Sequence, residues 1–270
     1  MDTRSSILRE LWTHRALVGI LVQRNIKIRY KGSTLGFFWS LASPLFSIVL
    51  YGVFLKLVAR GFAFDLHVLV TGIIIWQFVT LSVSDALGAV VGNANLIKKT
   101  AFPRLVLPVS TVMANLINFL MSGLVLLLYL LLSGASIRWA LAGWIPVIVL
   151  TQTALCIGLS SFVAAVNVFF RDAEHLLGHL LMAWFFATPI LYPLSLPLEA
   201  IRAHLPPAAV ALYFCNPMTG LVTAYRRILL DAPLDVPVRL VALSCAMAWL
   251  ILLGGVALFQ KTQSRFGDEL

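Results

Sequence analysis

The chain has 270 residues and a net charge of +9, and it is 60% hydrophobic but only 11% charged, with a mean hydropathy of +0.95. Soluble domains are about 45–50% apolar and about 25% charged, so this composition excludes a water-soluble globular protein. It predicts an all-α integral membrane protein, because a helix in lipid satisfies its own backbone groups. Nucleic acid is not an expected partner, since the sequence holds no soluble domain that would present a basic face.

The first element, residues 8–33, is apolar at its start and basic at its end. As a helix it would place Arg24 and Lys27 on one face and Leu21 and Ile28 on another. Such a helix would lie in the headgroup layer of the membrane, with its cations toward water and lipid phosphates. Two glycines in the stretch KGSTLG would then form a hinge before the first membrane span. A solvated basic arm that only sets the topology is the alternative.

Six apolar segments are candidates for membrane spans, each of which needs about 20 residues to cross. They cover residues 37–58, 66–91, 105–133, 140–168, 176–192 and 238–259. The fifth is short and rich in aromatic residues. Six crossings would put both termini on one side, where most of the 20 Lys and Arg residues also fall. The positive-inside rule therefore predicts cytoplasmic termini, within a single transmembrane domain over residues 1–270.

Two segments between the spans have compositions that are unusual for plain loops. Residues 93–104, NANLIKKTAFPR, mix apolar, basic and small polar residues, and Asn93 could cap a short helix there. Residues 193–237 hold two short apolar stretches broken by prolines, too short to span and too apolar to lie in water. A re-entrant or surface-lying pair of helices fits this pattern. Asn216 would cap the second of them, and Pro217 would lie in its first turn.

Four motifs, taken in order, resemble those of the membrane subunits of polysaccharide ABC exporters of the Wzm and KpsM type. They occupy residues 24–39, 93–103, 167–172 and 216–226. The resemblance runs from about residue 17 to about residue 259 and is closer to the O-antigen branch than to the capsule branch. It implies a permease subunit that moves a lipid-linked polysaccharide across the bacterial inner membrane, driven by ATP.

The resemblance also implies partners. The segment 93–104 would be a coupling helix that docks on an ABC ATPase subunit. Its expected contact residues are Asn95, Leu96, Ile97, Lys98 and Lys99. The chain has no G-x-x-x-x-G-K-[ST] motif, so ATP and Mg²⁺ would be bound by that separate subunit, and no cofactor is expected in this chain. Two copies of this chain and two ATPase subunits would complete the exporter.

The implied substrate is a glycan on a lipid pyrophosphate carrier that enters from the inner leaflet. The cations expected to meet the pyrophosphate, beyond setting the topology, are Arg24, Lys27, Arg29 and Lys31. Aromatic rings can pack on the CH faces of sugars. The candidate rings for the glycan path are Trp39, Tyr51, Trp76, Phe78, Trp184, Phe185, Phe186 and Tyr192. The outer gate is expected to include Asn216, Pro217, Tyr225 and Arg226.

Other functions have weaker support in the residues. The stretch EHLLGH, which begins at Glu174, lacks the H-E-x-x-H order of a zinc protease. Asp85 in the second span would suit a proton-coupled carrier, but it has no clear ionisable partner inside the spans. A membrane enzyme acting on lipid-linked sugars would need a G-x-S-x-G elbow or an inward pair of acids, and neither is evident. An ABC exporter subunit for a drug or a lipid is the nearer alternative.

Overall fold

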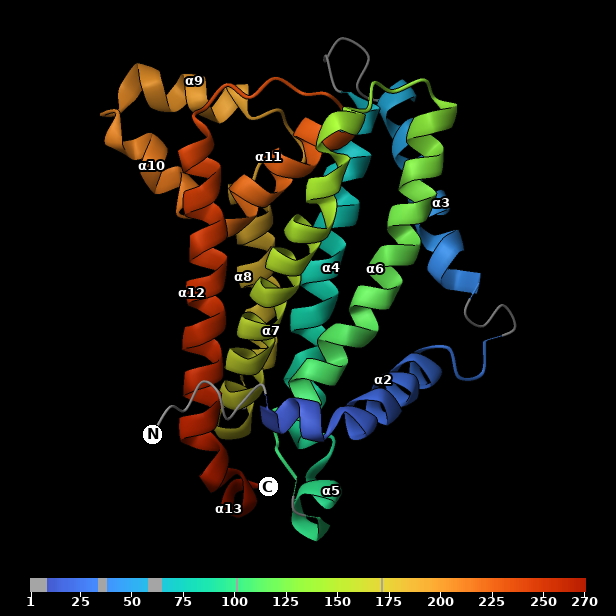
Figure 1. The fold of residues 1–270 in the computed structure, drawn as a ribbon, viewed down its shortest axis with the longest axis vertical. Helices are drawn as coiled ribbons and strands as arrows, with labels where there is room; N and C mark the ends of the chain where they lie inside the picture. Colours follow the sequence, from blue (N-terminus) through green and yellow to red (C-terminus); the bar gives the residue numbers. More distant parts are fainter. Residues whose placement is uncertain (1–8, 34–37, 58–64, 101, 171) are drawn as a thin grey trace.

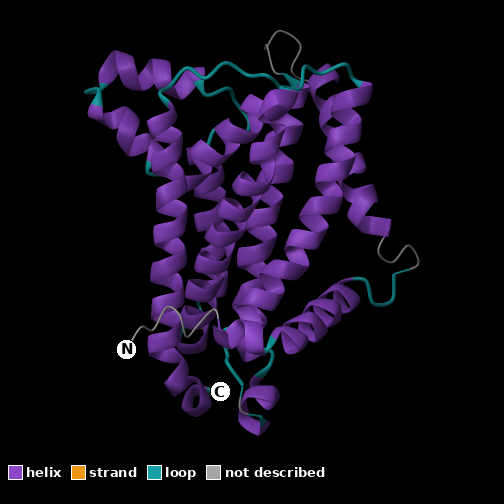
Figure 2. Cartoon of the chain, viewed as in Figure 1, coloured by secondary structure: helices purple, strands orange, loops and turns teal. Residues whose placement is uncertain are grey.

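The regular structure is entirely helical in a computed structural model that describes residues 9–33, 38–57, 65–100, 102–170 and 172–270. No strand is present in those residues, so the prediction of an all-α protein is confirmed (Figure 2). In chain order the elements are α2 (Arg15–Arg29), α3 (Trp39–Leu57), α4 (Leu66–Val91), α5 (Ala94–Lys99), α6 (Val106–Leu132), η2 (Trp139–Trp144), α7 (Ile145–Phe169), α8 (Ala173–Ala187), α9 (Ser195–His204), α10 (Ala208–Phe214), α11 (Pro217–Leu229), α12 (Val238–Thr262), η3 (Gln263–Arg265) and α13 (Phe266–Glu269).

Four helical segments in the described residues are long and apolar enough to cross a membrane. They are Leu66–Val91, Val106–Leu132, Trp139–Phe169 and Val238–Arg265. These segments contain α4, α6, α7 and α12, which run along the long axis of the bundle (Figure 1). Each overlaps one of the predicted spans, namely the second, third, fourth and sixth.

The other two predicted spans are not among these four segments. Helix α3 has 19 residues, and the predicted end residues of this span, 37 and 58, lie outside the described part of the chain. Helix α8 has only 15 residues, or ~22 Å, against a hydrocarbon core of ~30 Å. It ends at Ala187 instead of continuing to residue 192, because Pro189 disfavours helical geometry at the residue before it. The count of six crossings therefore stays a prediction.

The shorter helices lie at the two ends of the bundle. Helices α2, α5 and α13 lie at one end, called here the α5 end, whereas α9 and α10 lie at the opposite end, called the α9 end (Figure 1). At the α5 end, Ile97 of α5 and Phe266 of α13 pack into one buried cluster with Phe259 of α12. Helices near both ends of the described chain, α2 and α13, thus lie on the same side of the bundle.

Helices α7 and α12 approach each other closely at two glycines. A Cβ on Gly255 would overlap the carbonyl of Gly158, and a Cβ on Gly158 would lie 2.6 Å from the carbonyl oxygen of Ile251. Small residues at a helix crossing allow backbones in lipid to make extensive van der Waals contact. The two glycines therefore fix α7 and α12 in direct backbone contact.

Polar side chains of α7 bind α7 to α4. Three of them donate hydrogen bonds to backbone carbonyls of α4, namely Gln152 to Ile75 at 2.8 Å, Ser160 to Ser82 at 3.0 Å and Asn167 to Leu87 at 2.8 Å. They recur about every two turns, which keeps them on one face of α7. This row of hydrogen bonds fixes the register between the two central spans.

Replacing Ser160 with alanine is expected to lower the free energy of unfolding by about 0.6–1.7 kcal/mol, since it removes one interhelical hydrogen bond in lipid. The neighbouring Ser161 is the matched control, because it is equally buried and its Oγ has no hydrogen-bond partner among the described residues. Ser161→Ala should be neutral or slightly stabilising. Unfolding in mixed detergent micelles measures both, and equal losses would contradict the role given to Ser160.

Candidate functional site

Helix α2 is held against the transmembrane helices by its inward face and is followed by a glycine turn. Leu21 is buried in the same apolar cluster as Ile97 of α5. The helix ends at Arg29, and Gly32 has a φ of +78°, a left-handed conformation that glycine adopts without strain. The chain therefore turns at Gly32, while the second predicted hinge residue, Gly36, lies outside the described residues.

Arg24 lies on the inward face, which corrects its predicted placement beside Lys27. Positions 21 and 24 are three apart on a helix, as are 24 and 27, so the spacing allows either face and the contacts of Arg24 decide between them. Its Nη1 donates to Oδ1 of Asn93 at 2.7 Å, and Nδ2 of Asn93 donates to the carbonyl of Ala89 at 2.8 Å. The predicted capping role of Asn93 is wrong, because its side chain makes no capping hydrogen bond to α5. It links α2 to α4 instead.

An ion pair between Arg29 and Asp85 forms a second link between α2 and α4. Asn115 of α6 donates from Nδ2 to Oδ2 of Asp85 at 2.9 Å. Just beyond α2, the hydroxyl of Tyr30 donates to Oδ1 of Asn118 at 3.1 Å. The expectation that Asp85 lacks an ionisable partner holds only within the spans, because its partner comes from α2.

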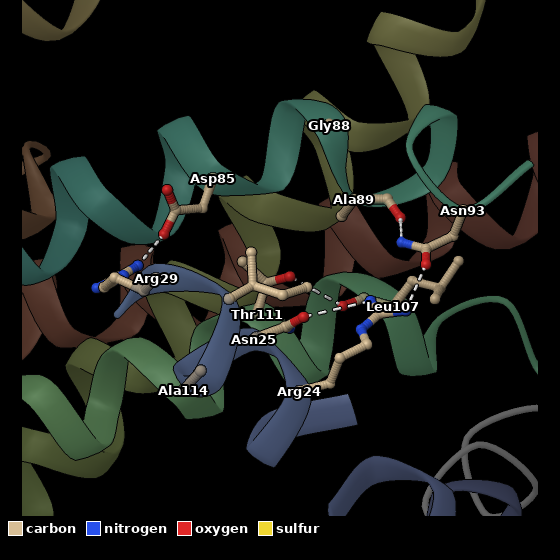
Figure 3. Close-up of a pocket in the computed structure, with 11 residues that line it drawn as sticks. Arg24, Asn25, Arg29, Asp85, Gly88, Ala89, Asn93, Leu107, Thr111 and Ala114 are labelled. Carbon is tan, nitrogen blue, oxygen red and sulfur yellow. Dashed lines mark hydrogen bonds and ion pairs between the residues drawn. The ribbon is translucent and has the colours of Figure 1, made fainter. Parts of the chain in front are cut away.

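A cavity of about 400 Å³ lies between α2, α4 and α6 (Figure 3). Arg29 and Asp85 meet at one side of it, and Arg24 and Asn93 meet at the other. Gly88 lines it from α4, and a Cβ built there would meet no atom within 4 Å. The cavity is thus bordered by two guanidinium groups, which suits it to an anionic ligand.

A second cavity of about 510 Å³ lies beyond the ion pair, next to α3. It is lined by Trp39 and Gln77 among others, and Arg29 and Asp85 line this cavity as well. The same ion pair therefore borders both cavities.

Only two of the four predicted headgroup cations, Arg24 and Arg29, line these cavities. Lys27 and Lys31 are exposed. Ile28, which was expected on the apolar face, lines the first cavity and is mostly exposed. The contact of any of these side chains with a pyrophosphate stays a prediction.

The predicted coupling residues of α5 divide into two groups. Asn95, Lys98 and Lys99 are exposed at the α5 end. Ile97 is buried and Leu96 is half-buried, and both pack into the apolar cluster of their own chain. The exposed group is free to contact a partner, whereas Ile97 anchors α5 to the bundle.

Four of the eight predicted aromatic rings come together between α4 and α8. The ring of Trp76 lies 5.3 Å from that of Trp184 and 5.7 Å from that of Phe185, which in turn contacts Phe186 at 5.4 Å. A cavity of about 360 Å³ is lined by Trp76, Phe185 and Phe186. These rings from two helices thus form one aromatic wall beside an open space.

The remaining predicted rings lie apart from this wall. Phe78 is buried and stacks on Phe119 at 4.9 Å. Tyr51 packs against the main core, and Trp39 lines the second cavity. Tyr192 donates its hydroxyl hydrogen to the carbonyl of Phe186 at 2.7 Å. The structure therefore brings together only part of the predicted set.

Asn216 begins α11 as predicted, with Pro217 in the first turn. Its Oδ1 accepts from the backbone N–H of Met218 at 3.0 Å and from Nε1 of Trp184 at 2.9 Å. Its Nδ2 donates to Oγ1 of Thr188 at 2.9 Å. One amide therefore joins the start of α11 to the end of α8 and to the aromatic wall.

Tyr225 and Arg226 of α11 point into the protein. The hydroxyl of Tyr225 donates to Oε1 of Gln152 at 2.9 Å. Arg226 is only 6% exposed and donates four hydrogen bonds to backbone carbonyls. Their acceptors are Pro189 at 2.6 Å, Tyr192 at 3.0 Å, Val68 at 2.9 Å and Ile190 at 2.7 Å. This arginine therefore binds the segment after α8 and not an open surface where a glycan would pass.

Comparison with known proteins places this chain in a family. Residues 16–230 match the ABC-2 type transporter family. The chain belongs to that family. It is therefore an integral membrane transport protein and not an enzyme, and its family membership implies an ABC ATPase partner.

This ABC-2 chain is also similar to curated proteins over nearly its full length. The O-antigen export system permease protein RfbA of Myxococcus xanthus is 35% identical over 269 residues, which cover 98% of this chain and 99% of the relative. A permease of the same name from Klebsiella pneumoniae is 30% identical over 258 residues, covering 94% and 95% of the two chains. A second Klebsiella pneumoniae permease is 29% identical over 255 residues, again covering 94% and 95%.

Two asparagines of α6 belong to this transporter's site, and the sequence-based prediction did not include them. Asn115 and Asn118 lie in the mostly apolar helix α6, and both are buried. Asn115 bonds to Asp85 of α4, and Asn118 bonds to Tyr30 just beyond α2. Polar side chains within a span usually face the protein interior and pair there. Two asparagines three residues apart therefore indicated which face of α6 lines the site.

Proposed function

We propose that this chain is the transmembrane subunit of an ATP-driven exporter of O-antigen-like polysaccharide carried on a lipid pyrophosphate. The observation that carries the proposal is the similarity, over 94–98% of the chain, to three O-antigen export permeases. All three relatives are named as O-antigen export permeases, and none of the three is named as a drug or lipid exporter.

The proposed topology places the α5 end in the cytoplasm of a bacterium and the chain in the inner membrane. The exposed Lys98 and Lys99 of α5 support this orientation through the positive-inside rule. Helices α3 and α8 would complete the six crossings. Both termini would then be cytoplasmic, since α2 and α13 lie at the α5 end.

The exporter would contain two copies of this chain with two ATPase subunits. Helix α8 supports a second copy, because several of its large apolar side chains are exposed in the single chain. Those more than half exposed are Leu176, Leu180, Met182 and Phe186. A large exposed apolar face on a membrane helix has to meet lipid or another protein helix. The aromatic wall adjoins this face and would then border a pathway between the copies.

The lipid pyrophosphate would enter beside α2. Arg24 and Arg29 line the first cavity, and guanidinium groups bind phosphate oxygens through paired, charge-assisted hydrogen bonds. The exposed Lys27 and Lys31 would attract the headgroup to this side of the membrane. The polysaccharide would follow along the aromatic wall, where the CH faces of its sugars pack on the exposed ring of Phe186.

The outer gate would be built from α10 and α11 at the α9 end. These short helices lie beside α12 near the α9 end of the bundle (Figure 1). Asn216 and Pro217 start α11, and Tyr225 fixes it against α7 through Gln152. In this arrangement Arg226 contributes by holding the gate in position and does not contact the glycan directly.

Export of O-antigen in living cells tests the proposal. A strain that synthesises O-antigen but lacks its own permease is supplied with this chain and its ATPase subunit, and surface glycan is measured with a specific antibody. We expect surface glycan to return. Intracellular retention of the glycan, together with resistance to drugs, would support the drug-exporter alternative and contradict the proposal.

Gly88→Leu provides a blocked variant for the same assay. The added side chain would occupy the first cavity without meeting existing atoms within 4 Å of its Cβ. A clash of about 1–3 kcal/mol with the headgroup should lower export by about fivefold or more. Gly254→Leu is the control, because a Cβ on this α12 glycine also meets nothing within 4 Å. Equal export by both variants would show that the first cavity is not on the pathway.

A further inference from the structure

The ion pair of Arg29 and Asp85 lies on the boundary between the two cavities beside α2. Both side chains line the cavity of about 400 Å³ and the cavity of about 510 Å³. Figure 3 shows the carboxylate of Asp85 directed at the guanidinium of Arg29, at one side of the first cavity. A ligand that moves from the first cavity to the second therefore has to pass this pair.

The pair is only partly shielded from solvent. The side chain of Arg29 is 28% exposed and that of Asp85 is 38% exposed. Partly exposed ion pairs contribute little to stability, because water and salt screen them. A phosphate group, in contrast, offers several anionic oxygens that match the guanidinium fork. The carboxylate is thus a weaker partner for Arg29 than a phosphate-bearing ligand would be.

The carboxylate and helix α2 each have a second attachment. Asn115, which is only 2% exposed, donates to Oδ2 of Asp85 at 2.9 Å. Helix α2 keeps its bond from Arg24 to Asn93, and the Tyr30 hydroxyl keeps its bond to Asn118 on α6. The contact between Arg29 and Asp85 can therefore open without releasing either the carboxylate or the helix.

We propose that Asp85 is a resident competitor that occupies Arg29 until a phosphate-bearing lipid headgroup displaces it. The headgroup enters the first cavity, binds the guanidinium of Arg29 and leaves Asp85 held by Asn115. Separation of the pair then joins the two cavities. This inference rests on the proposed function, since it deepens the assignment of the headgroup site.

The proposal predicts opposite effects for the two partners of one contact. Asp85→Asn removes the competing charge but keeps an oxygen that can accept from Asn115. It should tighten binding of a prenyl pyrophosphate by roughly two- to fivefold. Arg29→Gln removes the ligand of the phosphate and should weaken binding by at least about tenfold. A contact that only stabilises the fold would give changes of the same sign.

The experiment measures binding of farnesyl pyrophosphate to the full chain in complex with its ATPase subunit in nanodiscs. Inorganic pyrophosphate and farnesol are titrated in parallel. Lys27→Gln is the matched control, because it removes an exposed α2 cation that borders neither cavity. It should change affinity by less than Arg29→Gln. Asp85→Ser serves as a second variant in case Asp85→Asn folds poorly, and it should shift binding in the same direction.

Each outcome decides between specific alternatives. Tighter binding by Asp85→Asn and weaker binding by Arg29→Gln support the proposal. Weaker or unchanged binding by both Asp85 variants overturns it while leaving the headgroup site intact. An effect seen with inorganic pyrophosphate but not with farnesyl pyrophosphate overturns the assignment to a lipid headgroup. Absence of farnesyl pyrophosphate binding in every variant, wild type included, overturns the proposed headgroup site as well.

Discussion

Replacement of Arg226 by glutamine is expected to lower the free energy of unfolding by about 4 kcal/mol or more. Hydrogen bonds from a charged donor contribute about 1.5–3 kcal/mol each, and this guanidinium makes four to backbone carbonyls, two of them buried and two half-buried. The acceptors at Pro189, Ile190 and Tyr192 have no helix to pair with, because α8 ends at Ala187. In a membrane they would be left without partners, at a high free-energy cost. Thermal unfolding in detergent measures the loss.

Arg227 provides the control for this prediction. It lies next to Arg226 on α11 but is only half-buried, and it donates to a single carbonyl, that of Ala232, at 2.7 Å. Arg227→Gln should cost about 1–2 kcal/mol. Arg226→Lys should lower the free energy of unfolding by more than Arg227→Gln does, since one ammonium lacks the planar fork that reaches separate acceptors. Comparable losses for Arg226→Gln and Arg227→Gln would refute the proposed role of Arg226.

Reversal of the two exposed charges on α5, by Lys98→Glu combined with Lys99→Glu, should abolish stable association with the ATPase subunit. Like-charge or mismatched contacts at an interface cost several kcal/mol, so affinity should fall by about 100-fold or more. Folding should be unaffected, because both side chains are exposed. Copurification of the ATPase subunit with the tagged chain measures the effect.

Two further variants separate loss of docking from loss of folding. Lys261→Glu reverses an exposed charge on α12 near the α5 end and should leave copurification intact. Ile97→Ala should destabilise the chain by about 2–4 kcal/mol, because Ile97 is buried within its own subunit. Normal copurification by the double lysine variant would remove α5 from the proposed interface.

The sequence predicted the features that depend on long or local patterns. Helices α4, α6, α7 and α12 follow from apolar stretches long enough to cross lipid. The start of α11 follows from Asn216 and Pro217, because a cap and a first-turn proline are local signals. The early end of α8 was also predictable, since Pro189 carries its own signal against helix.

The contacts that build the site were less accessible to sequence reasoning. The position of Arg24 fits either a basic or an apolar face, and only the meeting with Asn93 shows which one it occupies. The burial of Arg226 depends on carbonyls released by the break at Pro189, far away in sequence. Pairings of this kind arise from how the helices pack, and periodicity within one helix does not contain them.

The backbone contact at Gly158 and Gly255 has a mechanical consequence. Helices α7 and α12 should move as one rigid pair, because their main chains are in direct contact where the two glycines meet. Helix α13 packs against the end of this helix pair and also against α5. A displacement of α5 would therefore be transmitted through α13 to α7 and α12 together. Helix α3, which lies beyond α6 in Figure 1, stands outside this rigid unit.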